Sequence, residues 1–175
     1  MSPPLFVSSL FFKSFGDRFG YSPALRPYYS APHGTPLLGG SGWTNSICQS
    51  TPRISGLTAN VKVAAGEGAA TARGPNRGAN LVHFAGAVGL TFAAQKVEAQ
   101  DTLGRPIAAF PGFGSQSAYQ LGGSFNAGFA RFFAQVGSID TKANAGVKVK
   151  NLHLSASVPV GPSGAFLAAY GNSSI

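Results

Sequence analysis

Apolar and polar residues alternate along paired segments of this chain, and this pattern leaves few folds open. In residues 79–98, ANLVHFAGAVGLTFAAQKVE, apolar residues such as Leu81, Leu90 and Phe92 recur at alternate positions on either side of a central glycine turn. Successive side chains of a β-strand point to opposite faces, so such alternation is typical of strands. The segment predicts a β-hairpin with one apolar face and one small, mostly polar face. A soluble sheet would bury the apolar face in a core, whereas a membrane barrel would turn it to lipid.

The hairpin unit recurs along the chain, in AGAVGLTFAAQ, NAGFARFFAQVG and VPVGPSGAFLAAYG. Eight strands are clear, with up to two more before residue 21. Short turns alternate with longer loops, which we expect at residues 66–78, within 97–116 and around 140–146. Strands of about ten residues with trim turns at one end and long loops at the other are typical of an outer-membrane β-barrel. The strands are predicted at residues 45–51, 57–65, within 79–98 as a pair, and at 117–126, 129–136, 150–158 and 165–170.

The composition favours lipid over water as the surroundings of the apolar face. Charged residues make up 10% of the chain, against about 25% in soluble domains. The polar positions hold mainly Ser, Asn, Gln and Gly, with Lys62 and Arg131 among them. Lys96 lies on the apolar register near a strand end, where its side chain can reach the interface. A bilayer would enforce this segregation, because an Arg facing its midplane costs about 2–4 kcal/mol.

Several other classes of protein are disfavoured. The formal net charge of +8 attracts anions, but the basic residues are scattered rather than clustered, so no nucleic-acid partner is predicted. No apolar run reaches the length of about 18 residues that a membrane helix needs. Neither metal-ligand spacing nor a catalytic pair is visible, so we expect no enzyme, metal site or cofactor. The amino terminus lacks a positive region and a cleavage site, so no signal peptide is predicted.

Four segments resemble successive hairpins of the general porins of Gram-negative bacteria, of the type common in β-proteobacteria. They occur in the family's order over about residues 21–170 and read NSICQSTPRISGLTANVKVAAGEGAA, GANLVHFAGAVGLTFAAQ, QLGGSFNAGFARFFAQVGSIDT and LHLSASVPVGPSGAFLAAYG. The resemblance implies a transmembrane antiparallel β-barrel of sixteen strands, usually a homotrimer in the outer membrane. With eight to ten strands, this chain resembles a fragment of such a barrel. The implied function is passive diffusion of small hydrophilic solutes and ions, with membrane lipid around the barrel.

The resemblance also divides the chain. Residues 1–20 match the family poorly and hold one or two strands at most, residues 21–43 correspond to the constriction loop, and residues 44–175 form the successive hairpins. The loop segment is rich in proline and glycine and contains no Asp or Glu. Arg26 and His33 in this loop, with Lys62 and Arg131 on the wall, are therefore the expected pore-lining residues. The positive charge of Arg26, Lys62 and Arg131, and of His33 when it is protonated, predicts a preference for anions.

Two other functions stay open at this point. One is a small closed barrel with a filled interior that serves as a structural or adhesive surface protein, since eight strands suffice for such a barrel. The other is a soluble β-sandwich that acts as a binding module. The direction in which each side chain points distinguishes these alternatives from a porin. In a porin wall, the apolar residues of each strand face lipid and the polar residues face the lumen. Leu57, Ala59, Val61, Leu81, Leu90, Phe92, Leu121, Phe132, Leu152 and Leu154 should face lipid, and Thr58, Asn60, Thr91, Gln120, Arg131 and Ser155 the lumen.

Overall fold

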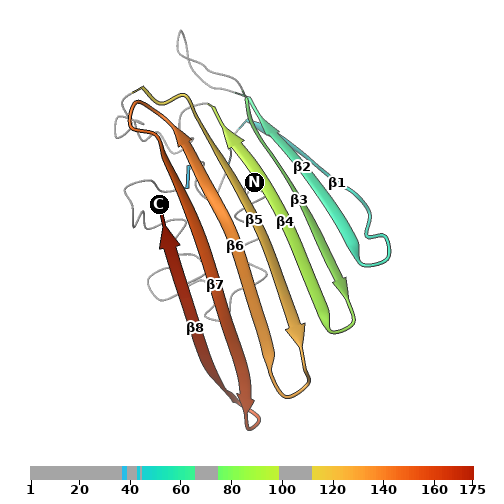
Figure 1. The fold of residues 1–175 in the computed structure, drawn as a ribbon. Helices are drawn as coiled ribbons and strands as arrows, with labels where there is room; N and C mark the ends of the chain where they lie inside the picture. The colour runs from blue at the N-terminus through green and yellow to red at the C-terminus, as the bar shows by residue number, and fades with distance from the viewer. Residues whose placement is uncertain (1–36, 39–42, 44, 66–74, 99–111) are drawn as a thin grey trace.

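Eight antiparallel strands form a single twisted sheet in chain order, each hydrogen-bonded to the next (Figure 1). The structure is a computed structural model that describes residues 37–38, 43, 45–65, 75–98 and 112–175. No helix among them has the length and apolarity needed to cross a bilayer. The strands are β1 (Ser46–Ser50), β2 (Leu57–Ala64), β3 (Asn76–Ala85), β4 (Val88–Val97), β5 (Ser115–Asn126), β6 (Arg131–Lys142), β7 (Val147–Val160) and β8 (Gly164–Ser174).

The connections differ between the two ends of the sheet, as the sequence predicts, but several strand boundaries were wrong, among them the end of β8, which lies at Ser174 rather than at residue 170. β3 begins at Asn76, inside the expected loop, because Asn76 pairs with Ala64 of β2. β6 continues to Lys142, because Asp140 pairs with Ser117 and Lys148 on its two neighbours. One end carries short turns, and the other carries the connections 65–75, 98–114 and 143–146. The last of these begins three residues later than expected. We call this second end the loop end.

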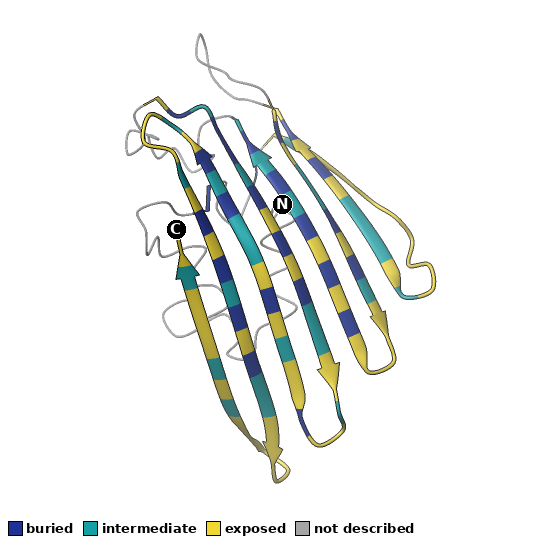
Figure 2. Cartoon of the chain, in the orientation of Figure 1, coloured by how far each residue is buried: buried dark blue, intermediate teal, exposed yellow. Residues whose placement is uncertain are grey.

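Burial alternates along the strands in the sense opposite to that of a soluble sheet. Figure 2 shows buried and exposed residues as successive stripes along β4 to β7. Leu90 is 49% exposed, whereas its neighbour Thr91 is 2% exposed. The strand register places all the predicted outward residues on one face and all the predicted inward residues on the other. The apolar face is thus the open one, and the polar face is the sheltered one.

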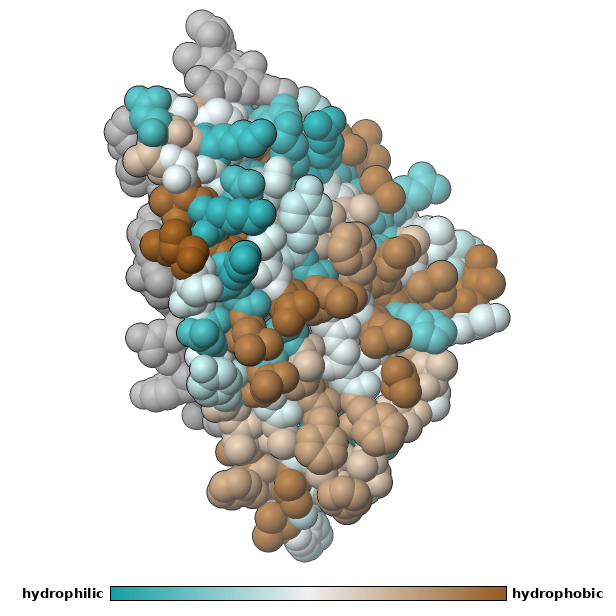
Figure 3. All heavy atoms as spheres, in the orientation of Figure 1, coloured by the Kyte–Doolittle hydropathy of each residue, from teal (hydrophilic) through white to brown (hydrophobic). Residues whose placement is uncertain are grey.

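The exposed apolar face is broad and continuous. Figure 3 shows hydrophobic residues gathered over the sheet, with hydrophilic residues concentrated at the loop end. Phe92, Leu121 and Val136 lie side by side in the ladder and are each about half exposed. Soluble monomers rarely expose apolar patches larger than a few hundred Å². An apolar face of this kind is typical of a surface that contacts lipid or a partner protein.

In the described sheet the outer edges of β1 and β8 have no strand beside them. Backbone N–H and C=O groups cannot stay unpaired in hydrocarbon, where each one costs several kcal/mol. An inserted form of this sheet therefore needs further strands at both edges or a closing contact between them. The curvature and order of the strands are those of one part of a barrel wall.

Two adjacent phenylalanines test the orientation. Phe132 is on the outward register and Phe133 on the inward one. In a Trp43→Phe background, tryptophan introduced by Phe132→Trp should be quenched strongly by brominated acyl chains, because it lies in lipid. Tryptophan introduced by Phe133→Trp should be quenched weakly. Fluorescence in brominated phosphatidylcholine vesicles measures both, and equal quenching at the two positions would contradict the assigned faces.

Two glycines at the short-turn end give a matched test of the turn that starts β2. Gly56 and Gly128 have φ angles of +84° and +86°, so alanine at either position costs about 1–2 kcal/mol. A Cβ at Gly56 would also collide with the carbonyl oxygen of Phe84, whereas one at Gly128 meets no atom within 4 Å. Gly56→Ala should therefore lower the temperature at which the SDS-resistant folded band is lost by more than Gly128→Ala does. Equal shifts would show that the close approach to Phe84 does not constrain the fold.

Candidate functional site

The inward face of the sheet is a wall of short polar side chains. Because successive strand residues alternate, every second residue of β2 to β7 is directed to this face. Amides and hydroxyls dominate it, and most are buried. The buried polar residues on this face are Lys62, Asn76, Asn80, Thr91, Gln95, Gln116, Gln120, Gln135, Thr141, Asn151, His153 and Ser155.

Side chains of neighbouring strands are joined across this wall. Asn60 Nδ2 donates to Asn80 Oδ1 over 2.7 Å, and Gln116 Nε2 donates to Thr141 Oγ1 over 2.9 Å. Further along, Gln120 Nε2 donates to Gln135 Oε1 and Ser173 Oγ donates to Asn151 Oδ1. Buried amides of this kind need partners, because an unsatisfied polar group costs about 1–3 kcal/mol. The bonds hold the wall in a defined shape.

Part of the segment that the sequence assigns to a constriction loop lies against this wall near the loop end. Leu38 N donates to Gln116 Oε1 over 2.7 Å, and Gln95 Nε2 donates to Leu38 O over 3.1 Å. Leu37 packs with Ala93, Ala118 and Ile139 of three successive strands. Two inward amides therefore form hydrogen bonds to the backbone of Leu38, which lies over the polar face.

Lys62 lies on the inward face, as predicted, but it is 1% exposed. Its Nζ is 5.6 Å from the centre of the Trp43 ring. A cation–π contact of this kind contributes about 0.5–2 kcal/mol. Trp43 also packs with Leu38 and Val97. Lys62 is thus covered by neighbouring side chains and is not open to the space beside the wall.

Arg131 is also on the inward register, at the first position of β6. It is exposed, and it lies at the short-turn end. Lys62 belongs to the loop-end half of β2, so the structure does not bring these two predicted residues together. The other two predicted residues, Arg26 and His33, lie outside the described residues.

Four inward side chains on β5 and β7 hold polar atoms that have no hydrogen-bond partner in the described part of the chain. They are Gln120 Oε1, Asn151 Nδ2, both ring nitrogens of His153, and Ser155 Oγ. In the ladder, His153 pairs with Gln135 and Asn151 with Gly137, which also pairs with Gln120. These side chains therefore lie on the same part of the inward face. Such groups can bond to water or to a polar solute. The sequence placed His153 on this face but gave it no role beyond that of a wall residue.

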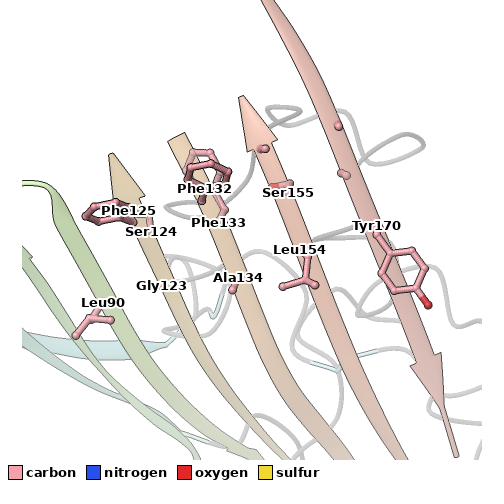
Figure 4. A pocket seen from close by; sticks show the side chains of 13 residues that line it. Leu90, Gly123, Ser124, Phe125, Phe132, Phe133, Ala134, Leu154, Ser155 and Tyr170 are labelled. Atoms are coloured by element: carbon pink, nitrogen blue, oxygen red, sulfur yellow. The ribbon is translucent and has the colours of Figure 1, made fainter. Parts of the chain in front are cut away.

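A hollow of about 780 Å³ lies on the opposite, apolar face. Small residues such as Gly123 and Ala134 floor it, and Phe125, Leu154 and Tyr170 surround it (Figure 4). Its lining offers almost no group that could bind an ion or a polar solute. We therefore assign it to contact with hydrocarbon, and not to a solute pathway.

The inward face offers hydrogen bonds and charge, but no cluster suited to metal binding. No group of three His, Cys, Asp or Glu side chains gathers within the residues that the structure describes. Cys48 is a free thiol at an exposed position on the inward register of β1, opposite Lys62. The wall can thus retain water, form hydrogen bonds to polar solutes and bias ions by sign.

Comparison with known proteins agrees with this arrangement. Residues 10–175 match the sequence model of the family described as Gram-negative porin. An anion-selective porin from Comamonas acidovorans has a similar fold, with a TM-score of 0.62 and 22% sequence identity. The match covers 75% of this chain and 39% of that porin, so the chain spans less than half the length of that solved protein. No curated protein matches the sequence. The family match spans nearly the whole chain, and the chain therefore belongs to the Gram-negative porins.

Proposed function

We propose that this chain forms part of the wall of an outer-membrane porin that lets small hydrophilic solutes and ions diffuse passively. The inverted burial of the sheet carries this proposal, because its polar face is sheltered and its apolar face is open. A water-filled lumen and surrounding lipid satisfy both faces at once. Transport of this kind is physical, and no bond in the solute is made or broken.

The segment of residues 21–43 acts as the constriction in this proposal. The contacts of Leu37, Leu38 and Trp43 with the inward face support it, because they bring this stretch onto the wall near the loop end. A narrow passage excludes large solutes by size, and the fixed charges beside it select ions by sign. Arg26 supplies positive charge from the segment, and His33 adds to it when protonated, while Lys62 and Arg131 supply positive charge from the wall.

The absence of acidic residues in the segment makes anions the preferred ions. No Asp or Glu occurs between residues 21 and 43, so its positive charge is unopposed within the loop. The porin from Comamonas acidovorans, whose fold is similar, is itself described as anion-selective. Small anions such as phosphate or carboxylates are therefore the solute class that we assign to the pore.

The membrane partners follow from the apolar face. We propose an outer-membrane location with lipid around the barrel, and the homotrimer that the porin resemblance implies. A soluble binding module or a structural or adhesive protein is the weaker alternative. A soluble module would need to bury Leu90, Phe92 and Leu121, each of which is about half exposed. An adhesive barrel with a filled interior would need bulky inward residues, and this wall consists mostly of short amides and hydroxyls.

Ion selectivity tests the proposed residues directly. A unit charge about 8 Å from a passing ion contributes about 0.5 kcal/mol in a water-like medium, and more in a narrow passage. Arg26→Gln and Lys62→Gln should each lower the anion-to-cation permeability ratio by about twofold or more. Arg131→Gln should have a smaller effect, because Arg131 is exposed at the short-turn end. Reversal potentials across a KCl gradient in planar bilayers measure these ratios.

Lys142 provides the control, because it is an exposed cation on the outward register. Lys142→Gln should leave the reversal potential unchanged. The anion preference should also weaken between 0.1 M and 1 M salt, as the screening length falls from about 10 Å to about 3 Å. A cation-selective pore, or one indifferent to the loss of Arg26, Lys62 and Arg131 together, would contradict the proposed selectivity.

A further inference from the structure

The outward face changes from apolar to basic within two residues of the loop end. Arg77 and Lys96 pair in the β3–β4 ladder, and both are on the outward register. The sequence places Lys96 near a strand end, but it assigns Arg77 to a loop. In the structure both side chains lie at the head of the lipid-facing surface, with 59% and 37% of their area exposed. Positive side chains at this depth lie where lipid head groups begin.

A groove of about 450 Å³ lies directly below these two cations. Its floor consists of Ala79 and Ala94, which pair across β3 and β4. The larger side chains of Val61 on β2 and Tyr119 on β5 flank the floor in the same ladder row. The small floor between two larger walls makes an apolar channel that opens upward onto the cations.

Glu98 modifies the charge at the head of the groove. Its Oε1 forms an ion pair with Lys96 Nζ and lies 3.6 Å from Arg77 Nη2. The hydrogen bond from Lys96 lowers the pKa of the Glu98 carboxyl from its usual value, which favours the charged carboxylate. The three side chains together leave one net positive charge. Glu98 also holds the two basic side chains toward each other.

We propose that this groove binds a phosphate-bearing membrane lipid, with the phosphate at Arg77 and Lys96 and the upper part of an acyl chain over Ala79 and Ala94. The proposal rests on the membrane insertion in the proposed function, but the pore itself plays no part in it. Guanidinium and ammonium groups are strong phosphate ligands when they act together. The hydroxyl of Ser117, which lines the same groove, supplies a further donor.

A lipid fits this site better than a free phosphate ion does. The apolar floor lies in direct continuity with the lipid-facing surface, and a free ion would leave it uncovered. Each positive side chain near a membrane surface contributes about 1 kcal/mol toward an anionic lipid, or about fivefold in binding. One net charge therefore predicts a preference of about fivefold over a zwitterionic lipid.

Tyr119→Trp provides a local reporter, since Tyr119 forms one wall of the groove. The full chain is inserted into phosphatidylcholine vesicles in a Trp43→Phe background. A fixed fraction of the lipid is then replaced by brominated phosphatidic acid or by brominated phosphatidylcholine. We expect brominated phosphatidic acid to bind at the reporter about fivefold better. Added inorganic phosphate at millimolar concentration should not displace it, which separates lipid from free ion.

Three variants make the expectation specific to the groove. Arg77→Gln should reduce the preference to about one, because it removes the net charge. Glu98→Gln should raise the preference several-fold, because it removes the competing carboxylate. Lys148→Gln is the matched control. Lys148 is in the same ladder row as Ser117 and Asp140, but it lies on β7, two strands away from Ser117 and the groove. It should leave the preference unchanged.

The outcomes separate this inference from the proposed function. Equal binding of the two brominated lipids by the reporter chain without Arg77→Gln, Glu98→Gln or Lys148→Gln would overturn the lipid site and leave insertion intact. An equal loss of preference with Lys148→Gln and Arg77→Gln would replace the site by a diffuse surface charge, and would overturn it as well. Quenching by neither lipid would refute both the insertion and the site.

Discussion

The structure depends on one constraint, which is that every strand must suit hydrocarbon on one face and water on the other. Hydrocarbon accepts no unpaired backbone group, so the segments cross as strands of a continuous antiparallel ladder. The period of two then divides each strand between lipid and water, as for Leu90 and Thr91. A shift of one residue in any pairing would exchange the faces of the whole strand. The pairing register of this sheet therefore also fixes which of its faces is apolar and which is polar.

The inward face, which the alternation makes polar, offers hydrogen-bonding groups to water and solutes. Its amides bond to each other across the strands and to the backbone of Leu38, which brings a non-strand segment onto the wall. Other polar atoms of this face, such as both ring nitrogens of His153, have no hydrogen-bond partner within the described residues. The wall thus combines internal hydrogen bonds with polar groups that can bond to water. This arrangement suits a passage for water and small polar solutes.

The alternation allowed the sequence to predict the fold class, the eight strands and the face of each side chain. It misplaced boundaries where polar residues continue a strand. Asp140 and Arg77 read as loop residues, yet both lie in the ladder, because backbone pairing with a neighbouring strand overrides local polarity. The burial of Lys62 under Trp43 depends on contacts between distant segments, which no local pattern contains. The basic groove on the outer face was missed for the same reason.

Conductance during chemical modification tests most directly whether the polar face is a wet pore wall. In a Cys48→Ser background, a charged thiol reagent can be applied to single open channels with Ser155→Cys or its neighbour Leu154→Cys. Ser155 is on the inward register and Leu154 on the outward one. Modification of Ser155→Cys should lower the conductance in discrete steps, and modification of Leu154→Cys should leave it unchanged. A conductance that responds at Leu154→Cys and not at Ser155→Cys would contradict the porin wall.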